Sequence, residues 1–347
     1  MIIPHSKPLI DTEDIKAAKE VLASGHIAQG QRVREFETKL AKTVGVKYGV
    51  AVSSGTSAIH LALTALNVGA GDEVIIPSYV CAAPYMAALH AGATPKIVDI
   101  DPSSFNVSAH TAQRAATPKT KAIIVPHMFG CPAELDGLLE LGRPIVEDCA
   151  QSLGAEYKKR SVGSFGRLGV CSFYATKMIT TGEGGMVLTD DHEIYNRALE
   201  VREYNKRPLT TVRYNYKMSD IQAALGLTQL KKLKYFIERR REIAAIYNER
   251  FAEYDVTLPS IPSHKKSVFY RYVVLLDRLE HIQKAARKSG IMCEKPVWQP
   301  LHRSLPSITN CPNSDYVHDH ALSIPLYPSL TPKEVEYVAK TIHAILP

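Results

Sequence analysis

The sequence lacks the long apolar stretches and the cysteine spacing of membrane and zinc-binding proteins. No run of apolar residues approaches the roughly 18 that a membrane-spanning helix requires. Near the start, Pro4, Pro8 and Asp11 interrupt the sequence before the apolar core of a signal peptide can form. The six cysteines show neither CxxC nor CxxH spacing. We therefore predict a cytoplasmic protein with reduced thiols, no membrane segment and no metal site.

Two nucleotide-binding signatures are also missing. No Gly-x-Gly-x-x-Gly segment follows a predicted strand, which disfavours a nicotinamide-dependent dehydrogenase, the main alternative from another enzyme class. The loop 53–57 contains glycine and hydroxyl side chains, but no Gly-Lys-Ser/Thr follows, so it is not a Walker loop.

The formal charge of +7 includes a basic cluster within 231–241, which we interpret as a solvated helix face rather than a nucleic-acid site. The net positive charge could instead favour an anionic substrate such as a nucleotide diphosphate.

The 347 residues, 45% of them hydrophobic, are enough for two domains. Short apolar runs alternate with helical patterns between residues 48 and 190, which predicts βαβ units and a mainly parallel sheet. We expect an α/β fold with a large domain at 1–235 and a smaller C-terminal α/β domain at 236–347. The predicted strands are 50–52, 74–76, 96–100, 122–125, 144–146, 170–173, 186–188, 268–276 and 291–297, and the predicted helices are 57–66, 219–251, 279–289 and one from Pro332.

The first candidate site segment is Ser53-Ser-Gly-Thr-Ser57, between a predicted strand and a predicted helix. Its backbone N–H groups and hydroxyls lie at the start of the helix, which is a favourable place for an anion such as phosphate. Gly55 permits close approach of the backbone. A simple helix cap without a ligand explains this segment equally well.

The second candidate is Asp148, which ends the apolar run 144–148. The carboxyl end of a parallel strand is where open α/β sheets bind ligands, and a buried carboxylate there needs a cationic partner. A protonated pyridine ring would supply that partner through a charge-assisted hydrogen bond. A helix cap or an ordinary salt bridge is the alternative. Gln151, three residues later, could reach a hydroxyl on such a ring, or it could be a surface residue.

Lys177 is the third candidate, in Ser172-Phe-Tyr-Ala-Thr-Lys177 before Gly182-Glu-Gly-Gly185. A single lysine is normally a solvated surface group. Here it lies in a short connection between apolar runs, where burial would lower its pKa toward that of an amine nucleophile. A lysine, an aspartate at a strand end and phosphate-binding hydroxyls are the groups that a pyridoxal phosphate (PLP) enzyme requires. Together they predict a PLP-dependent enzyme, most simply an aminotransferase.

Four ordered motifs, together with segments 25–30, 300–302 and 323–328, resemble the DegT/DnrJ/EryC1/StrS sugar aminotransferases almost from end to end. The motifs are Val52–Ala58, Val146–Gly154, Ser172–Lys177 with Gly182–Gly185, and Tyr214–Asp220. The resemblance implies the fold type I, aspartate aminotransferase-like architecture and a homodimer with shared active sites. It also implies transamination of a keto sugar, a nucleotide-linked 3- or 4-keto-deoxyhexose, with L-glutamate as donor.

The resemblance also assigns roles to individual residues. Lys177 would form the Schiff base with the cofactor, and Asp148 would hold the pyridine nitrogen. Cys81 stands where many relatives place an aromatic residue that stacks on the ring, and Tyr79 or Tyr85 could substitute. The remaining cofactor contacts would be Gly55, Thr56, Ser57, Gln151, Ser172 and the partner subunit's Asn215, and the substrate contacts would be Ile27, Gln29, Tyr79, Arg213 and His302.

Two alternatives stay open within the same family. A dehydrating branch replaces the lysine with histidine, so Lys177 favours amino transfer, although another PLP reaction such as elimination uses similar groups. A non-catalytic regulatory or binding protein is the other alternative. Activity after Lys177→Ala separates the latter from an enzyme, because only an enzyme would lose its function.

Overall fold

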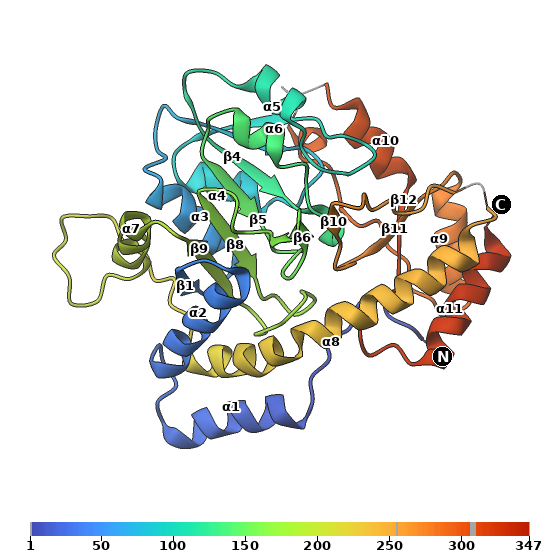
Figure 1. Cartoon of the computed structure of the whole chain (residues 1–347), viewed down its shortest axis with the longest axis horizontal. Helices are drawn as coiled ribbons and strands as arrows, with labels where there is room; N and C mark the ends of the chain where they lie inside the picture. The colour runs from blue at the N-terminus through green and yellow to red at the C-terminus, as the bar shows by residue number, and fades with distance from the viewer. Residues whose placement is uncertain (1, 255, 306–309, 347) are drawn as a thin grey trace.

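The computed structural model describes residues 2–254, 256–305 and 310–346. A seven-stranded sheet forms its centre, in the order β1-β9-β8-β5-β4-β2-β3 (Figure 1). Within this sheet β9 is antiparallel to both of its neighbours, and the other strands share one direction. The mainly parallel sheet is therefore confirmed. Its strands are β1 (Tyr48–Val52), β2 (Glu73–Pro77), β3 (Thr94–Val98), β4 (Thr120–Pro126), β5 (Ile145–Asp148), β8 (Leu168–Ser172) and β9 (Gly185–Thr189).

Helices cover both faces of this sheet, and each face has its own apolar core. One core contains Phe36, Ile123 and Phe173, and the other contains Leu61, Ile76 and Val187. The strands therefore bury side chains on both faces of the sheet, as expected for a parallel sheet covered by helices. The helices of this part are α1 (Thr12–Ser24), α2 (Gln31–Val44), α3 (Gly55–Ala65), α4 (Ala83–His90), α5 (Ala109–Ala115), α6 (Asp136–Glu140) and α7 (His192–Arg202), with a 3₁₀ turn at Met128–Gly130.

The C-terminal part has a separate core around Tyr247, Tyr272 and Ile342. It pairs β11 (Tyr272–Leu275) with β12 (Ala321–Ile324), and it also holds α9 (Leu279–Lys288), α10 (Pro312–His320), α11 (Pro332–Ile345) and a 3₁₀ turn at Leu301–Ser304. The helix predicted from Pro332 is confirmed, and Thr331 forms a capping box with Glu334. Segments that are far apart in the sequence form a small third sheet. Its strands are β6 (Glu156–Tyr157), β7 (Arg160–Ser161) and β10 (Lys265–Lys266).

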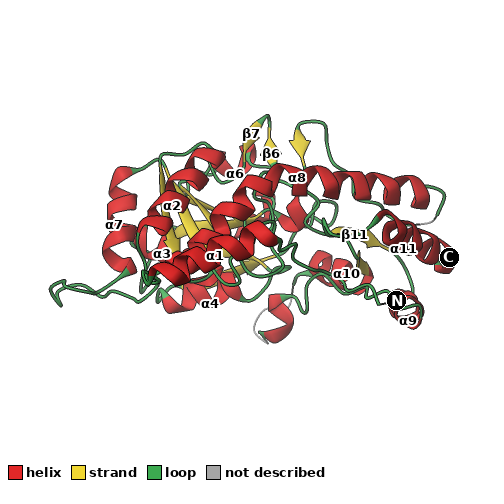
Figure 2. Ribbon diagram, turned by 90° about the horizontal axis from the view of Figure 1, so that it is seen from below, coloured by secondary structure: helices red, strands yellow, loops and turns green. Residues whose placement is uncertain are grey.

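Helix α8 (Asp220–Phe251) is continuous over 32 residues and joins the two parts of the molecule (Figures 1 and 2). Its Leu233 and Phe236 belong to a core of the sheet-containing part, whereas Ile243 and Tyr247 belong to the C-terminal core. The predicted boundary between residues 235 and 236 thus falls inside a helix, and the division into domains at that point stays a prediction. No helix among the described residues is both long enough and apolar enough to cross a membrane.

The predicted strand 291–297 is wrong. Alternate residues of this segment are buried, as in a strand, but its pairing is limited to the isolated bridges at Ile291 and Glu294. Pro296 has no N–H group to donate to a neighbouring strand, and β12 pairs with β11 instead. The predicted strand 268–276 is shortened to β11, because Phe269 has a φ of 48° and interrupts the extended backbone.

Candidate active site

Four connections that carry the candidate residues leave the same edge of the central sheet. They follow β1, β2, β5 and β8, which share one direction. Asp148 is therefore the carboxyl end of its strand, and the loop 53–57, Cys81 and Lys177 lie beyond the carboxyl ends of theirs. The topology alone therefore gathers residues that are up to 124 positions apart in the sequence, as in other open α/β sheets.

The loop after β1 forms the candidate phosphate cradle. Ser54 caps α3, and its Oγ accepts a hydrogen bond of 3.0 Å from the N–H of Ser57. Gly55 begins the helix, and a Cβ added there would lie 2.7 Å from the Cβ of Ser172 and 2.9 Å from its Oγ. Glycine at this position thus brings the helix N-terminus against the end of β8. The N–H groups of Gly55 and Thr56 and the Ser172 hydroxyl fit a phosphate group.

Asp148 ends β5 and is 7% exposed. Burial raises the pKa of its carboxyl group, although an N–H bond from Ala150 (3.0 Å) and the charges of Lys177 and His127 oppose that effect. The hydrogen bond and the nearby charges therefore do not fully offset the burial of the carboxylate, and a protonated pyridine nitrogen would stabilise its ionised form. Gln151 accepts a 2.8 Å hydrogen bond from the N–H of Phe129 through Oε1, which leaves its amide N–H groups for a ring hydroxyl.

Lys177 lies in the turn after β8, where its N–H donates to the carbonyl of Tyr174 at 2.9 Å. The side chain is partly buried, and Nζ lies 5.2 Å from the centre of the Tyr270 ring. Desolvation raises the pKa of Asp148 and of Cys81, and the positive charge of Lys177 opposes that rise at both, so the three side chains share one electrostatic environment. Cys81 keeps solvent exposure, as a residue at the rim of a cofactor site would. The structure thus brings the predicted lysine and aspartate together.

Tyr270 is a site residue that sequence reasoning missed. It is buried, and its hydroxyl lies 3.3 Å from Oγ1 of Thr176, the residue before Lys177. Burial alone raises the pKa of the phenol, but Lys177, Arg271, the Thr176 hydrogen bond and Arg240 together lower it to about 8. No motif surrounds Tyr270, so only the fold could reveal this contact.

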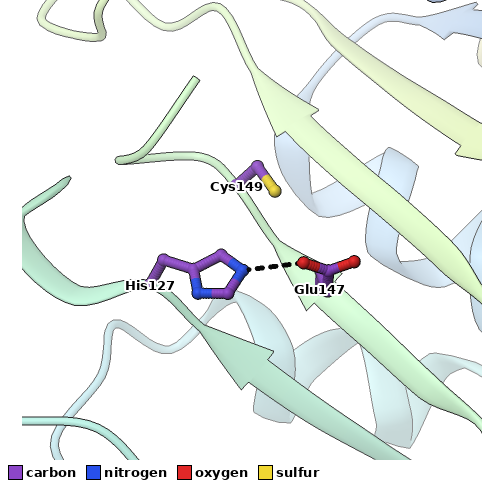
Figure 3. A group of neighbouring side chains, drawn as sticks. All are labelled: His127, Glu147 and Cys149. Carbon is purple, nitrogen blue, oxygen red and sulfur yellow. Dashed lines mark hydrogen bonds and ion pairs between the residues drawn. The ribbon is translucent and has the colours of Figure 1, made fainter. Parts of the chain in front are cut away.

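His127, Glu147 and Cys149 form a buried group around the end of β5 (Figure 3). These residues carry potential metal ligands, but hydrogen bonds already engage the imidazole and the carboxylate. His127 donates through Nε2 to Glu147 (3.1 Å) and accepts at Nδ1 from the N–H of Ala133 (3.0 Å). Glu147 also accepts three backbone N–H bonds of 2.7–2.8 Å from 163, 165 and 166. The group is therefore a hydrogen-bonded support for the end of β5.

Burial raises the pKa of Glu147, but the hydrogen bond and charge of His127 and the backbone N–H bonds outweigh burial and lower it. Because Nδ1 of His127 accepts the N–H of Ala133, the hydrogen that Glu147 accepts lies on Nε2. Successive residues of a strand point to opposite faces, so Glu147 faces its supporting loop while Asp148 faces away from it.

Two predicted substrate residues line a cavity with a volume of about 640 Å³. Ile27 is 47% exposed, and Oε1 of Gln29 is buried without a hydrogen-bond partner among the described residues. Asp220, at the start of α8, fixes this region because its carboxylate accepts N–H bonds from Gly30 (2.8 Å) and Val33 (3.0 Å). The cavity is thus bounded by α1, α8 and the loop before α2.

Tyr79 and His302 are already engaged with the protein. Tyr79 is fully buried, and its ring centroid lies 6.3 Å from that of Phe105. His302 makes contacts through both ring nitrogens, with the hydroxyl of Ser78 (2.6 Å) and the carboxylate of Asp315 (3.2 Å). Their roles as substrate contacts stay predictions.

Arg213 and Asn215 belong to segment 203–215, which extends away from the rest of the molecule beside α7 (Figure 1). The Nε of Arg213 donates to Glu200 at 2.9 Å, so this guanidinium has a partner within its own subunit. Asn215 is exposed, and its Oδ1 accepts from Nζ of Lys217 at 2.6 Å. A role for Asn215 at the partner's cofactor stays a prediction.

Comparisons with known proteins agree with this geometry. The model of the DegT/DnrJ/EryC1/StrS aminotransferase family matches residues 8–343. GDP-perosamine synthase of Escherichia coli O157:H7 is 34% identical over 98% of both chains. A UDP-N-acetyl-3-dehydro-alpha-D-glucosamine 3-aminotransferase of Acidithiobacillus ferrooxidans is 32% identical over 99% of this chain and 96% of that protein. Spr1654 from Streptococcus pneumoniae, solved in a PLP-form, superimposes with a TM-score of 0.94 at 28% identity, covering 99% of this chain and 98% of its own.

Proposed function

Because the chain belongs to the DegT/DnrJ/EryC1/StrS aminotransferase family and is therefore a PLP-dependent sugar aminotransferase, we propose a more specific reaction. The substrate is a nucleotide-linked 3- or 4-keto-deoxyhexose, the amino donor is L-glutamate, and the product is an amino sugar. The observation that carries this proposal is the meeting of Lys177, Asp148 and the Gly55–Ser172 cradle at one edge of the sheet.

The bound cofactor supplies a protonated ring that withdraws electrons from the carbon that loses a proton. Asp148 keeps the ring nitrogen protonated, and each pKa unit it adds corresponds to about 1.36 kcal/mol. Lys177 would anchor the cofactor through its amine, and once free the amine would accept the substrate's proton at Nζ and return it. The N–H groups of Gly55 and Thr56, at the N-terminus of α3, would hold the phosphate of the cofactor.

Three observations support a nucleotide-linked sugar. The relatives named above act on GDP- and UDP-sugars according to their names. The cavity beside Ile27 and Gln29, of about 640 Å³, is large enough for more than a simple monosaccharide. The chain also carries a formal charge of +7, which favours an anionic diphosphate over a neutral sugar.

The proposed assembly is a homodimer in which each subunit contributes to the other's site. Segment 203–215 supports this, because Leu209 is 97% exposed and Val212 73% exposed in the single chain. Apolar side chains with this exposure are typical of residues that a partner covers.

The test begins with the colour of the purified protein. A yellow species should appear with PLP, change on addition of glutamate and become fixed to Lys177 by borohydride. Lys177→Ala should lower turnover by at least about 10⁴-fold, because it removes both the covalent anchor and the proton carrier. Lys234→Ala is the matched control, since its side chain is 88% exposed. A colourless protein, or a Lys177→Ala variant with full activity, would overturn the proposal.

A further inference from the structure

Two cations lie over the ring of Tyr270. Nζ of Lys177 lies 5.2 Å from the ring centre, and the guanidinium carbon of Arg271 lies 4.8 Å from it. Nη2 of Arg271 also donates to the Tyr270 hydroxyl at 3.4 Å. Arg271 is therefore separated from the catalytic lysine by a single aromatic side chain.

The charges around Tyr270 are not balanced. The charged groups that act on it are Lys177 after β8, Arg240 on α8 and Arg271 before β11, and all three are cations. Within the part of the chain that the structure describes, neither arginine forms an ion pair with a carboxylate. The buried Arg240 donates instead to backbone carbonyls, including those of Tyr270 (3.1 Å) and Leu326 (2.9 Å). Buried charges are normally paired, so an anion is expected here.

The remaining neighbour of Arg271 is held neutral. Nη1 of Arg271 donates to Nδ1 of His5 at 3.1 Å, and Nε2 of His5 lies 2.8 Å from the hydroxyl of Ser323. Burial and the charge of Arg271 lower the pKa of His5 to about 3, so the imidazole stays neutral at working pH. His5 orients the guanidinium through a hydrogen bond but contributes no negative charge.

Arg271 also lines a cavity of about 390 Å³ between segments 101–134 and 257–275. The other cation of its wall, Lys265, is paired with Glu134 at 2.6 Å. The wall includes Phe129, whose N–H group donates to the candidate cofactor contact Gln151. The wall also carries the carboxylate of Asp101, which accepts hydrogen bonds from Ser103. A small molecule inside the cavity would therefore meet one guanidinium, that of Arg271, which forms no ion pair among the described residues.

We propose that Arg271, oriented by Tyr270 and His5, is an anion subsite that binds a carboxylate group of the amino donor. This inference rests on the proposed function and names the residue that would recognise the donor. Guanidinium groups match carboxylates in geometry and form charge-assisted hydrogen bonds with them. A carboxylate there would also complete the charge balance around Tyr270.

The direct test is binding of glutarate, a dicarboxylate that has no amine to transfer, to the PLP-loaded full-length protein. Calorimetry should show binding that Arg271→Met weakens by about 10- to 100-fold, the loss expected for one charge-assisted contact. Arg271→Lys should keep part of the affinity because it retains the charge. Arg241→Met is the matched control, since Arg241 donates to the carbonyl of Ser267 in the same connection and does not line the cavity.

Tyr270 provides a second readout that does not depend on turnover. Its ¹³C-labelled phenol, assigned with Tyr270→Phe, should titrate near pH 8, and glutarate should raise that pKa because a carboxylate offsets the charge of Arg271. Unchanged glutarate binding in Arg271→Met, or a Tyr270 titration that glutarate does not alter, would overturn the proposal.

Steady-state kinetics separate the donor from other anions. Arg271→Met should raise KM for glutamate by about 10- to 100-fold and leave KM for the keto sugar nearly unchanged. A rise in KM for the sugar alone, or binding of inorganic phosphate in place of glutarate, would assign the subsite to a phosphoryl group and refute the donor role. If the wild type aminates sugars with a donor that has no carboxylate, this inference fails while the aminotransferase function stands.

Discussion

The ionised side chain of Asp148 should stabilise the PLP-bound protein and destabilise the PLP-free protein. Its pKa in the folded chain is raised above the unfolded value by burial, so the folded state binds a proton more tightly. Its contribution to stability is present at low pH and is lost as the pH rises through the raised pKa. A pyridinium cation beside the ionised carboxylate would offset this loss of stability. Cofactor affinity should therefore decrease as the pH falls through the pKa of Asp148, because the protonated carboxyl group no longer attracts the cation.

The substitution Asp148→Asn separates these two effects. In the PLP-free protein at neutral pH, it should raise the melting temperature by on the order of a few degrees, because it removes a buried charge but keeps an acceptor for Ala150. In the loaded protein it should lower kcat by about 10²-fold or more. Scanning calorimetry and transamination assays measure both. Asp136→Asn, at an exposed site, should change neither, and a destabilised PLP-free Asp148→Asn protein would contradict the argument.

Individual residues differ in how far the sequence reveals them. Lys177 and Asp148 were predictable because each lies within a short motif at the end of an apolar run, where local sequence determines their surroundings. Tyr270 and Arg271 have no such motif. Their proximity to Lys177 depends on how the C-terminal part packs against the sheet, and the pattern of residues 268–276 indicates only a strand.

Among the secondary-structure elements, the ends of the strands determine the site more than their interiors do. Predicted and observed strands of the central sheet agree within a few residues, because buried parallel strands form short apolar runs with polar ends. The prediction failed for 291–297, where alternating burial was present but strand pairing was not. Burial periodicity is a local property, whereas pairing requires a partner with free N–H and C=O groups.

Gly55→Ala tests the packing of α3 against β8. The new Cβ would lie 2.7 Å from that of Ser172, so the helix N-terminus must shift away from the strand end. We expect PLP affinity to fall by about tenfold or more and stability to fall by about 1–3 kcal/mol. Gly69→Ala is the control, because the nearest atom there is the Ala91 carbonyl oxygen at 4.0 Å. Unchanged cofactor affinity in Gly55→Ala would show that this close contact does not shape the phosphate site.

For the whole molecule, the proposed dimer predicts complementation between two damaged chains. Lys177→Ala removes the lysine of one site, and in the proposed dimer Asn215→Ala would remove a contact to the partner's cofactor. A mixed dimer would contain one site with both residues intact, so random pairing of equal amounts should restore about a quarter of wild-type activity. Co-expression with two affinity tags isolates the mixed dimers for assay. Mixed dimers no more active than their parents would show that Asn215 acts within its own subunit.

The choice of sugar is the property of the whole molecule that the sequence reveals least. The cavity beside Ile27 and Gln29 is bounded by α1, by α8 and by a loop that Asp220 fixes from 190 residues away. Its shape follows from packing between these elements. Composition and local motifs carry no signal for it, which is why the reaction class could be predicted and the substrate could not.

The continuous helix α8 has a consequence for how substrates enter. The helix is continuous and contributes residues to the cores of both parts. A hinge closure of one part onto the other would therefore have to bend the helix and break some of its backbone hydrogen bonds. Access must then be controlled by the short connections at the sheet edge and by the segment that protrudes beside α7. Selectivity in this enzyme can accordingly be redesigned by exchanging loops on a rigid frame.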